Sequence, residues 1–331
     1  MAIDSATRTD ALDARVQRRE GRREFFRSAL GGAAVAAAGI AATGIATPAA
    51  AQSAPTEADV LNFALNLEYL EAQFYAYAAT DAGLPAALLG GSGQQGAVAG
   101  GRRVAFTDPA VAAYAREIAA DELAHVTFLR AQLGTSAVAQ PAIDVSVGPN
   151  TAFSNAARAA GLITAGQTFD PYASDENFLL GAFIFEDVGV TAYKGAAALL
   201  TSKTYLEAAA GILAVEAYHA AIIRTTLSAK GFATPTLLTQ ADGISNARDT
   251  LDGGTEIDQG ISPTSRAVVS GTTTTTYTLS NVVPADGNAI VYSRTPGQVL
   301  NIVYLTATAA GLGGFFPAGV NGTIKTAAAA A

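Results

Sequence analysis

Apolar residues recur at the three- and four-residue spacing of an amphipathic helix in four long segments of the chain. The pattern predicts helices over residues 57 to about 80, 108–134, 175 to about 200 and 203–231. Thr56 and Asp59 form a capping-box-like pair at the first start, and Gly134 is a typical helix end. Each helix would be ~37 Å long at 1.5 Å per residue, which is typical of a helix bundle.

Two connections of different length join these helices. Residues 81–106 link the first two and include a Gly-rich stretch. Residues 135–173 link the second and third, and this segment is too long for a tight turn. We therefore predict an all-α four-helix bundle over residues 55–232, with a long crossover between its two halves.

The composition changes after residue 232, where helical periodicity stops and Gly, Thr, Pro and Asp become more frequent. We expect residues 233–331 to form an irregular C-terminal extension packed on the bundle. Residues 268–279 include five consecutive Thr and predict a β-hairpin or an extended arm. Thr295 and Pro296 begin a short amphipathic stretch through Tyr304, which predicts one more helix.

The N-terminal segment, residues 1–51, differs from the rest of the chain because it carries seven Arg and five acidic residues. The sequence GRREFFR at 21–27 precedes an apolar Gly/Ala run and a cleavage-like Ala-Ala-Ala at 49–51. This order resembles a twin-arginine export signal. It implies the twin-arginine export machinery as a partner, and a periplasmic or extracellular location. The alternative is an uncleaved membrane anchor, but Gly and Thr make the run a poor span, so we expect no stable membrane insertion after cleavage.

The residue types that are absent or rare limit the chemistry. The chain has no Cys and only two His, so disulfides, thiolate metal sites and a thiol nucleophile are excluded. Half of the residues are apolar, as expected for a globular protein, and the net charge of −8 argues against nucleic-acid binding.

Both histidines occur in the same local pattern on a predicted helix. His125 follows Glu122 by three residues, and His219 follows Glu216 by three. Positions i and i+3 share a helix face, so each pair directs a carboxylate and an imidazole to one side. Each pair is therefore a candidate for binding a metal ion.

The other two predicted bundle helices share a second pattern, in which Tyr75 follows Glu68 by seven residues and Tyr193 follows Glu186 by seven. Both glutamates lie among apolar neighbours, where a carboxylate must find a partner or be neutralised. Glu71, three residues after Glu68, is an alternative metal ligand to it. If Glu68 is the ligand, Glu71 is an additional oxygen donor, a proton relay or a surface acid. The two tyrosines are candidate catalytic residues, either redox-active or donating hydrogen bonds at the site. The alternative for both is core packing.

Along the chain, the helices thus carry Glu, Glu-x-x-His, Glu and Glu-x-x-His. This is the ligand order of dinuclear carboxylate bundles that hold two iron or two manganese ions. The four carboxylates would balance two divalent cations, and oxygen and imidazole donors suit either metal. The predicted metal ligands are Glu68, Glu122, His125, Glu186, Glu216 and His219.

With these residues the chain resembles the ferritin-like superfamily, whose metal-binding helices are similar to DELAH at 121–125 and EAYHA at 216–220. Beyond the bundle it resembles the ferritin-like desiccation-related proteins. The similar tail motifs are ISNARD at 244–249, VPAD at 283–286, RTPGQVL at 294–300 and GGFFP at 313–317. The resemblance covers about residues 55–322. It implies a ferritin-like bundle and a role in stress or desiccation.

Four further charged residues have roles that the sequence leaves open. Asp121 and Asp187 adjoin predicted ligands, and each either fixes an imidazole N–H or is a surface acid. We expect Arg248 and Arg294 to tie the extension to the bundle.

Three functions are compatible with these features. The first is an exported dinuclear metal protein that handles O2, peroxide or Fe(II) as an oxidase, a ferroxidase or a peroxide-consuming enzyme, with a small oxidant or metal ion as substrate. The second is metal sequestration without turnover. The third is a structural stress protein with a vestigial site, against which the full ligand set argues. A homo-oligomer is compatible with all three.

Overall fold

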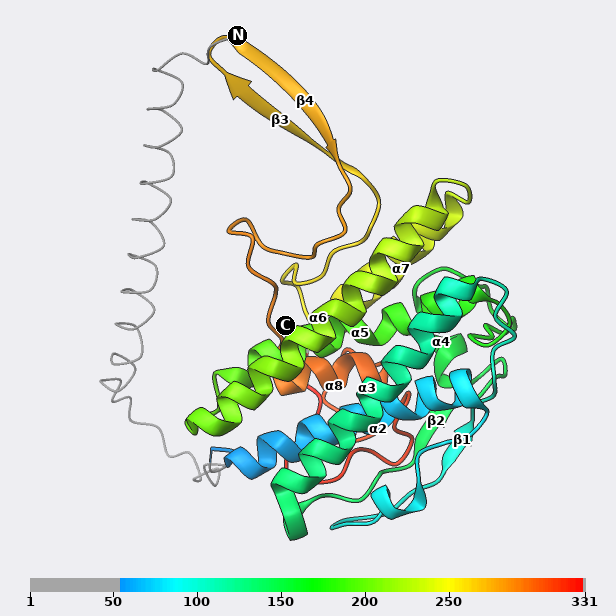
Figure 1. Cartoon of the computed structure of the whole chain (residues 1–331), viewed down its shortest axis with the longest axis vertical. Coiled ribbons are helices and arrows are strands. Elements are labelled where there is room, and N and C mark those ends of the chain that lie inside the picture. The colour runs from blue at the N-terminus through cyan, green and yellow to red at the C-terminus, as the bar shows by residue number, and fades with distance from the viewer. Residues whose placement is uncertain (1–53, 330–331) are drawn as a thin grey trace, which may run out of the picture. The chain divides into compact units, whose positions relative to one another are not determined.

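Four long helices form the core of the computed structural model, which describes residues 54–329 (Figure 1). The expected export signal at residues 1–51 lies outside the described residues. The bundle helices are α2 (Glu57–Thr80), α3 (Pro109–Leu133), α5 (Asp175–Ala197) and α6 (Lys203–Gly231). The predicted all-α bundle with a C-terminal extension is therefore confirmed.

Side-chain caps determine where these helices begin. Thr56 and Asp59 form the capping box at the start of α2, and the Ser174 and Ser202 side chains cap α5 and α6. α3 begins one residue later than expected, because the Asp108 carboxylate accepts the first free N–H of the helix.

The bundle consists of two helix pairs, α2 with α3 and α5 with α6. Its aromatic core lies where the first helices of the two pairs face each other. The Phe74 ring of α2 stacks 5.6 Å from Phe178 of α5, and Phe185 of α5 meets Phe315 of the extension at 4.8 Å. The extension thus completes the core of the bundle.

The connections contain short elements only. They are the 3-10 turns η2 (Ala86–Leu88) and η3 (Gly134–Ser136), the strands β1 (Val98–Gly100) and β2 (Ile143–Val145), and the helix α4 (Ala152–Ala159). β1 and β2 pair in parallel, so the loop after α2 is joined to the long crossover after α3.

The extension contains one long helix that the sequence analysis did not predict. Its elements are α7 (Thr236–Asp252), the hairpin strands β3 (Thr264–Ser270) and β4 (Thr273–Leu279), and α8 (Pro296–Tyr304). The buried positions of α7 do follow helical spacing, but Ser245, Arg248 and Asp252 are among them. Polar residues on the buried face conceal the periodicity on which a sequence-based assignment depends.

Buried ion pairs attach the extension to the bundle. Arg248 of α7 donates to Asp187 of α5 at 2.9 Å and to Asp258 at 2.7 Å. Arg294 donates to the Thr191 hydroxyl of α5 at 2.9 Å and, within the extension, to Asp252 at 2.6 Å and Asp258 at 2.8 Å. All of these side chains are nearly inaccessible to solvent, so the two arginines tie the extension down as expected.

α6 is long and apolar enough to cross a bilayer by length and composition, with a mean hydropathy of 1.4 in its most apolar window. In this structure it is a bundle helix. Its inner face carries the fully buried Glu216 and the nearly buried His219.

Candidate metal centre

The predicted ligands converge in the middle of the bundle. α2 contributes Glu68, α5 contributes Glu186, and α3 and α6 each contribute a Glu-x-x-His pair. The four carboxylates are at most 1% exposed, and the two histidines at most 8%. Helical spacing places each Glu one turn from its His, so both side chains of a pair point inward.

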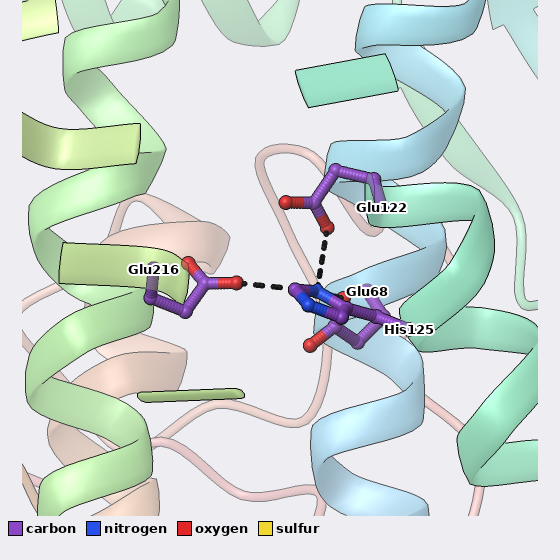
Figure 2. A group of neighbouring side chains, drawn as sticks. All are labelled: Glu68, Glu122, His125 and Glu216. Carbon is purple, nitrogen blue, oxygen red and sulfur yellow. Dashed lines mark hydrogen bonds and ion pairs between the residues drawn. The ribbon is translucent and has the colours of Figure 1, made fainter. Parts of the chain in front are cut away.

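Three carboxylates surround the His125 ring, as Figure 2 shows. The Nδ1 atom of His125 lies 3.2 Å from Glu68 and 3.6 Å from both Glu122 and Glu216. Because Glu68 and Glu216 come from α2 and α6, this group joins three helices.

A second group forms around His219, whose Nδ1 lies 3.1 Å from Glu122 and 3.6 Å from Glu186. In each group the potential donor atoms lie within 4.8 Å of one another, and Glu122 belongs to both. One oxygen of Glu122 faces each histidine. The structure therefore brings all six predicted residues into two adjoining groups with one shared carboxylate.

The two tyrosines contact the glutamates of the opposite helix. The Tyr75 hydroxyl on α2 donates to Glu186 on α5, and the Tyr193 hydroxyl on α5 donates to Glu68 on α2. Each tyrosine takes one carboxylate oxygen, and the other oxygen of that carboxylate faces a histidine. Burial, with the nearby glutamates, raises the pKa of both tyrosines well above the ordinary value, so both hydroxyls keep their protons.

Asp121 contacts one imidazole from the outer side of the site. Its carboxylate lies 3.2 Å from Nε2 of His219, on the ring side opposite to the nitrogen that faces the glutamates. A carboxylate in this position fixes the tautomer and orientation of a metal-binding histidine. The Asp121 side chain is 44% exposed, so it also forms the solvent side of the centre.

Asp187 has a different role from the two that the sequence left open. It is buried and accepts hydrogen bonds from Arg224 and Arg248, and it therefore belongs to the ion pairs that hold the extension.

Glu71 is buried beside the centre but belongs to neither of the two groups. Burial and the adjacent glutamates raise its pKa well above the ordinary value. Gly189 makes room here, because a Cβ at this position would lie 2.2 Å from Glu216 and 3.4 Å from Glu71. Neither the sequence spacing nor the helix pattern could have singled out Gly189.

The protein groups of the centre differ widely in their pKa values. Burial raises the pKa of Glu68 to about 7 and that of Glu186 to about 8. For Glu122, burial is outweighed by the two nearby imidazoles, which lower its pKa to about 2. Burial alone would lower the pKa of His125, but Glu68 and Glu122 raise it to about 11.

The donor set fits divalent metal ions. Six buried donor atoms of the centre have no hydrogen-bond partner among the described residues. They are both carboxylate oxygens of Glu122 and of Glu216, one oxygen of Glu186 and Nδ1 of His219. Buried polar atoms are normally satisfied, so such a cluster at one point indicates a ligand that the protein atoms do not supply. Carboxylate and imidazole donors without sulfur suit iron or manganese.

A four-helix bundle in which two helices carry Glu-x-x-His and two carry Glu is the arrangement of ferritin-like carboxylate proteins. Comparison with known proteins agrees with this class. The family model for the ferritin-like domain matches residues 56–229.

Two known proteins are similar to this one over most of the chain. One is a ferritin-like catalase from Nesocodon mauritianus, 30% identical over 81% of this chain and 84% of its own length. The other is a desiccation-related protein from Craterostigma plantagineum, 31% identical over 74% of this chain and 76% of its own. No solved structure shows significant similarity. The chain belongs to the ferritin-like family, in the group of desiccation-related proteins.

Proposed function

We propose that the protein holds two iron or two manganese ions in this centre and uses them to consume hydrogen peroxide. The observation that carries the proposal is the buried cluster of four carboxylates and two imidazoles on four helices. The similarity to a ferritin-like catalase supports peroxide as the substrate, and the similarity to a desiccation-related protein supports a role in stress.

The residues of the chain would perform three tasks. Glu68, Glu122, Glu186 and Glu216, with His125 and His219, would hold the ions, and the four negative charges would balance two divalent cations. Tyr75 and Tyr193 fix the carboxylates of Glu186 and Glu68. Asp121 orients His219.

Disproportionation of peroxide to water and O2 needs a centre that exchanges two electrons, and a pair of iron or manganese ions would supply this exchange. The protein restricts what reaches the centre. The most exposed of the six ligands is His125, at only 8%, and the partly exposed Asp121 covers His219 on its outer side. Such a closed site favours a reactant as small as peroxide over a larger organic substrate.

The test is a comparison of two glutamates on α3. Glu122→Gln removes the shared carboxylate, whereas Glu117→Gln changes an exposed residue of the same helix. Each protein is loaded with Fe(II) or Mn(II), analysed for bound metal, and assayed for O2 release from hydrogen peroxide. We expect two ions per chain and O2 release in the parent and Glu117→Gln proteins, and neither in Glu122→Gln.

Other outcomes would select the alternatives. Two bound ions without peroxide consumption would favour metal sequestration, and Fe(II)-dependent O2 uptake would favour a ferroxidase. Absence of bound metal in the loaded parent protein would overturn the proposal and leave a structural stress protein.

We also propose that the protein is exported by the twin-arginine machinery and acts in the periplasm or outside the cell. The sequence GRREFFR at residues 21–27 supports this. Arg22→Lys with Arg23→Lys should keep the protein in the cytoplasm. Arg18→Lys with Arg19→Lys, an adjacent Arg pair outside the motif, is the matched control. Equal export of both variants would contradict this route.

A further inference from the structure

The β3–β4 hairpin, which we call the arm, has no covering layer in the part of the chain that the structure describes. All fourteen residues of its two strands are exposed, and Figure 1 shows the strands as a ribbon apart from the bundle helices. A two-stranded hairpin alone is marginally stable in water and needs a hydrophobic face packed on another element. The arm therefore lacks a partner among residues 54–329 of the single chain.

The strand register collects large apolar side chains on one face of the arm. Arg266 pairs with Tyr277, Thr264 pairs with Leu279, and Val268 pairs with Thr275. Because side chains alternate between faces and cross-strand partners share a face, Val268, Tyr277 and Leu279 lie on the same side, with Arg266 beside Tyr277. They are 45%, 53% and 42% exposed. The opposite face carries Val269 among small residues that are mostly Thr.

The base of the arm is held rigidly although the arm itself is uncovered. Arg224 of α6 is fully buried and donates hydrogen bonds to main-chain oxygens on both sides of the hairpin. These oxygens belong to Gln259, Gly260, Asn281 and Val282. The direction of the arm is thus set by the bundle, which distinguishes it from a loop that simply lacks structure.

An apolar groove lies beside this base, with a volume of about 340 Å³. It is lined by α5, by the outer side of α6 and by the segment that follows the arm. Its walls include Val190, Leu213, Ala214, Ala217, Val283 and Pro284. Arg224 also borders the groove, but its guanidinium is already bonded to main-chain oxygens. The groove therefore offers an apolar surface without a polar anchor for a small ligand.

We propose that the apolar face of the arm of one copy packs into the groove of a second copy, and that a two-fold axis makes the exchange reciprocal. The segment that follows the arm borders the groove, so the arm and the groove of one copy lie next to each other. When the arm of the first copy enters the groove of the second, the arm of the second therefore lies close to the groove of the first, as a closed two-fold dimer requires. Arm and groove together approach the ~20–30 residues per side of a stable interface.

The charges permit this contact. Arg266 is the only charged residue between positions 259 and 285, whereas the whole chain has a net charge of −8. An arm without acidic residues meets no like-charge repulsion on an acidic partner.

The first test compares the two faces of the arm by molecular mass. Val268→Lys with Tyr277→Lys places two charges on the apolar face, and Thr274→Lys with Thr276→Lys, both on β4, places the same number of charges on the opposite face of the arm. In light scattering or sedimentation, we expect a dimer for the parent and the threonine variant, and a monomer for the apolar-face variant. A monomeric parent protein, or identical masses for the two variants, would overturn the proposal.

The second test uses the absence of cysteine from the chain. Val268→Cys and Ala214→Cys are made in separate proteins, which are then mixed and treated with a short bifunctional maleimide. A cross-linked pair forms only if the arm of one copy reaches the groove of another. Thr276→Cys replaces Val268→Cys as the control and should react much less. Equal cross-linking of both, or none, would contradict the assigned face. Metal content plays no part in either result, so both are independent of the proposed function.

Discussion

At the scale of single residues, Gly189 determines whether the Glu216 carboxylate fits into the centre. An added Cβ would lie 2.2 Å from that carboxylate, so Gly189→Ala should displace it. We expect fewer bound ions per chain, measured by elemental analysis after loading. We also expect a lower free energy of unfolding in urea, although Ala is better than Gly by ~1 kcal/mol in a helix interior.

Gly211 on α6 is the matched control, because the Cβ that Gly211→Ala would add meets no atom within 4 Å beyond its chain neighbours and the adjacent backbone of its own helix. At this position only the higher helix propensity of alanine acts. The free energy of unfolding should therefore rise by about 0.5–1 kcal/mol, with unchanged metal content. If Gly189→Ala raised the free energy of unfolding by the same amount, the Glu216 carboxylate would not need the space that the missing Cβ of Gly189 leaves.

The tyrosines give a second prediction at this scale. Tyr75→Phe and Tyr193→Phe each remove a hydrogen bond to a candidate ligand. Loss of such a partner typically lowers metal affinity ~10–100-fold, and chelator competition would measure it. Tyr218→Phe, at a position 71% exposed on α6, is the control. Unchanged affinity with lost peroxide consumption would instead indicate a redox role, and no change in either would indicate core packing.

The sequence indicated Glu122, His125, Glu216 and His219 because histidine is rare and each occurs three residues after a glutamate. It indicated Glu68 and Glu186 because both lie among apolar residues and a tyrosine follows each by seven. The seven-residue spacing of Glu68 and Tyr75 singled out a tyrosine that does contact the centre, but it did not indicate which glutamate the tyrosine contacts. Tyr75 meets the glutamate of α5 instead of the one on its own helix. Such contacts between helices depend on the packing of the bundle, which local spacing does not encode.

At the scale of elements, the buried ion pairs between α5, α7 and the segment before α8 determine how firmly the extension is attached. Arg248→Met would leave Asp187 and Asp258 each without one buried partner. Breaking a buried pair in this way costs ~3–5 kcal/mol. We expect a lower free energy of unfolding in urea and faster proteolysis of the extension.

Arg116 on α3 is exposed and provides the comparison. Arg116→Met should change the free energy of unfolding by no more than about 0.5 kcal/mol. Equal stability of the two variants would mean that the ion pairs do not attach the extension.

The helices of the bundle were predictable because apolar faces and capping residues agree, as at Thr56 and Ser174. α7 was not, since its buried face includes Arg248 and Asp252, whose partners are distant in sequence. A buried polar residue looks like a surface residue until its partner is known.

At the scale of the whole molecule, the charges of the centre should make metal binding depend on pH. In the ion-free protein, the raised pKa values of Glu68 and Glu186, about 7 and 8, mean that both carry protons at pH 5. Ions bind the deprotonated groups, so affinity should rise from pH 5 to pH 8 and binding should release protons. Calorimetry in two buffers of different ionisation enthalpy would count them.

The stability of the ion-free protein should change in the opposite direction. Both groups bind protons more tightly in the folded than in the unfolded state, where the ordinary pKa is 4.5. Their contribution to stability is therefore complete below that value and lost as the pH rises through 7 and 8. Urea unfolding of the ion-free protein at pH 5 and pH 8 would reveal the loss, and an increase instead would contradict the burial of these carboxylates.

The crossed contacts between Tyr75 and Glu186, and between Tyr193 and Glu68, have a consequence for how the molecule is assembled. The α2–α3 pair supplies half of the ligands and the α5–α6 pair the other half, and each half fixes a carboxylate of the other. A partly folded chain in which only one pair has formed offers no complete coordination shell. A redox-active ion would thus be retained only after the two helix pairs have packed together, so metal loading would depend on completed folding of the bundle.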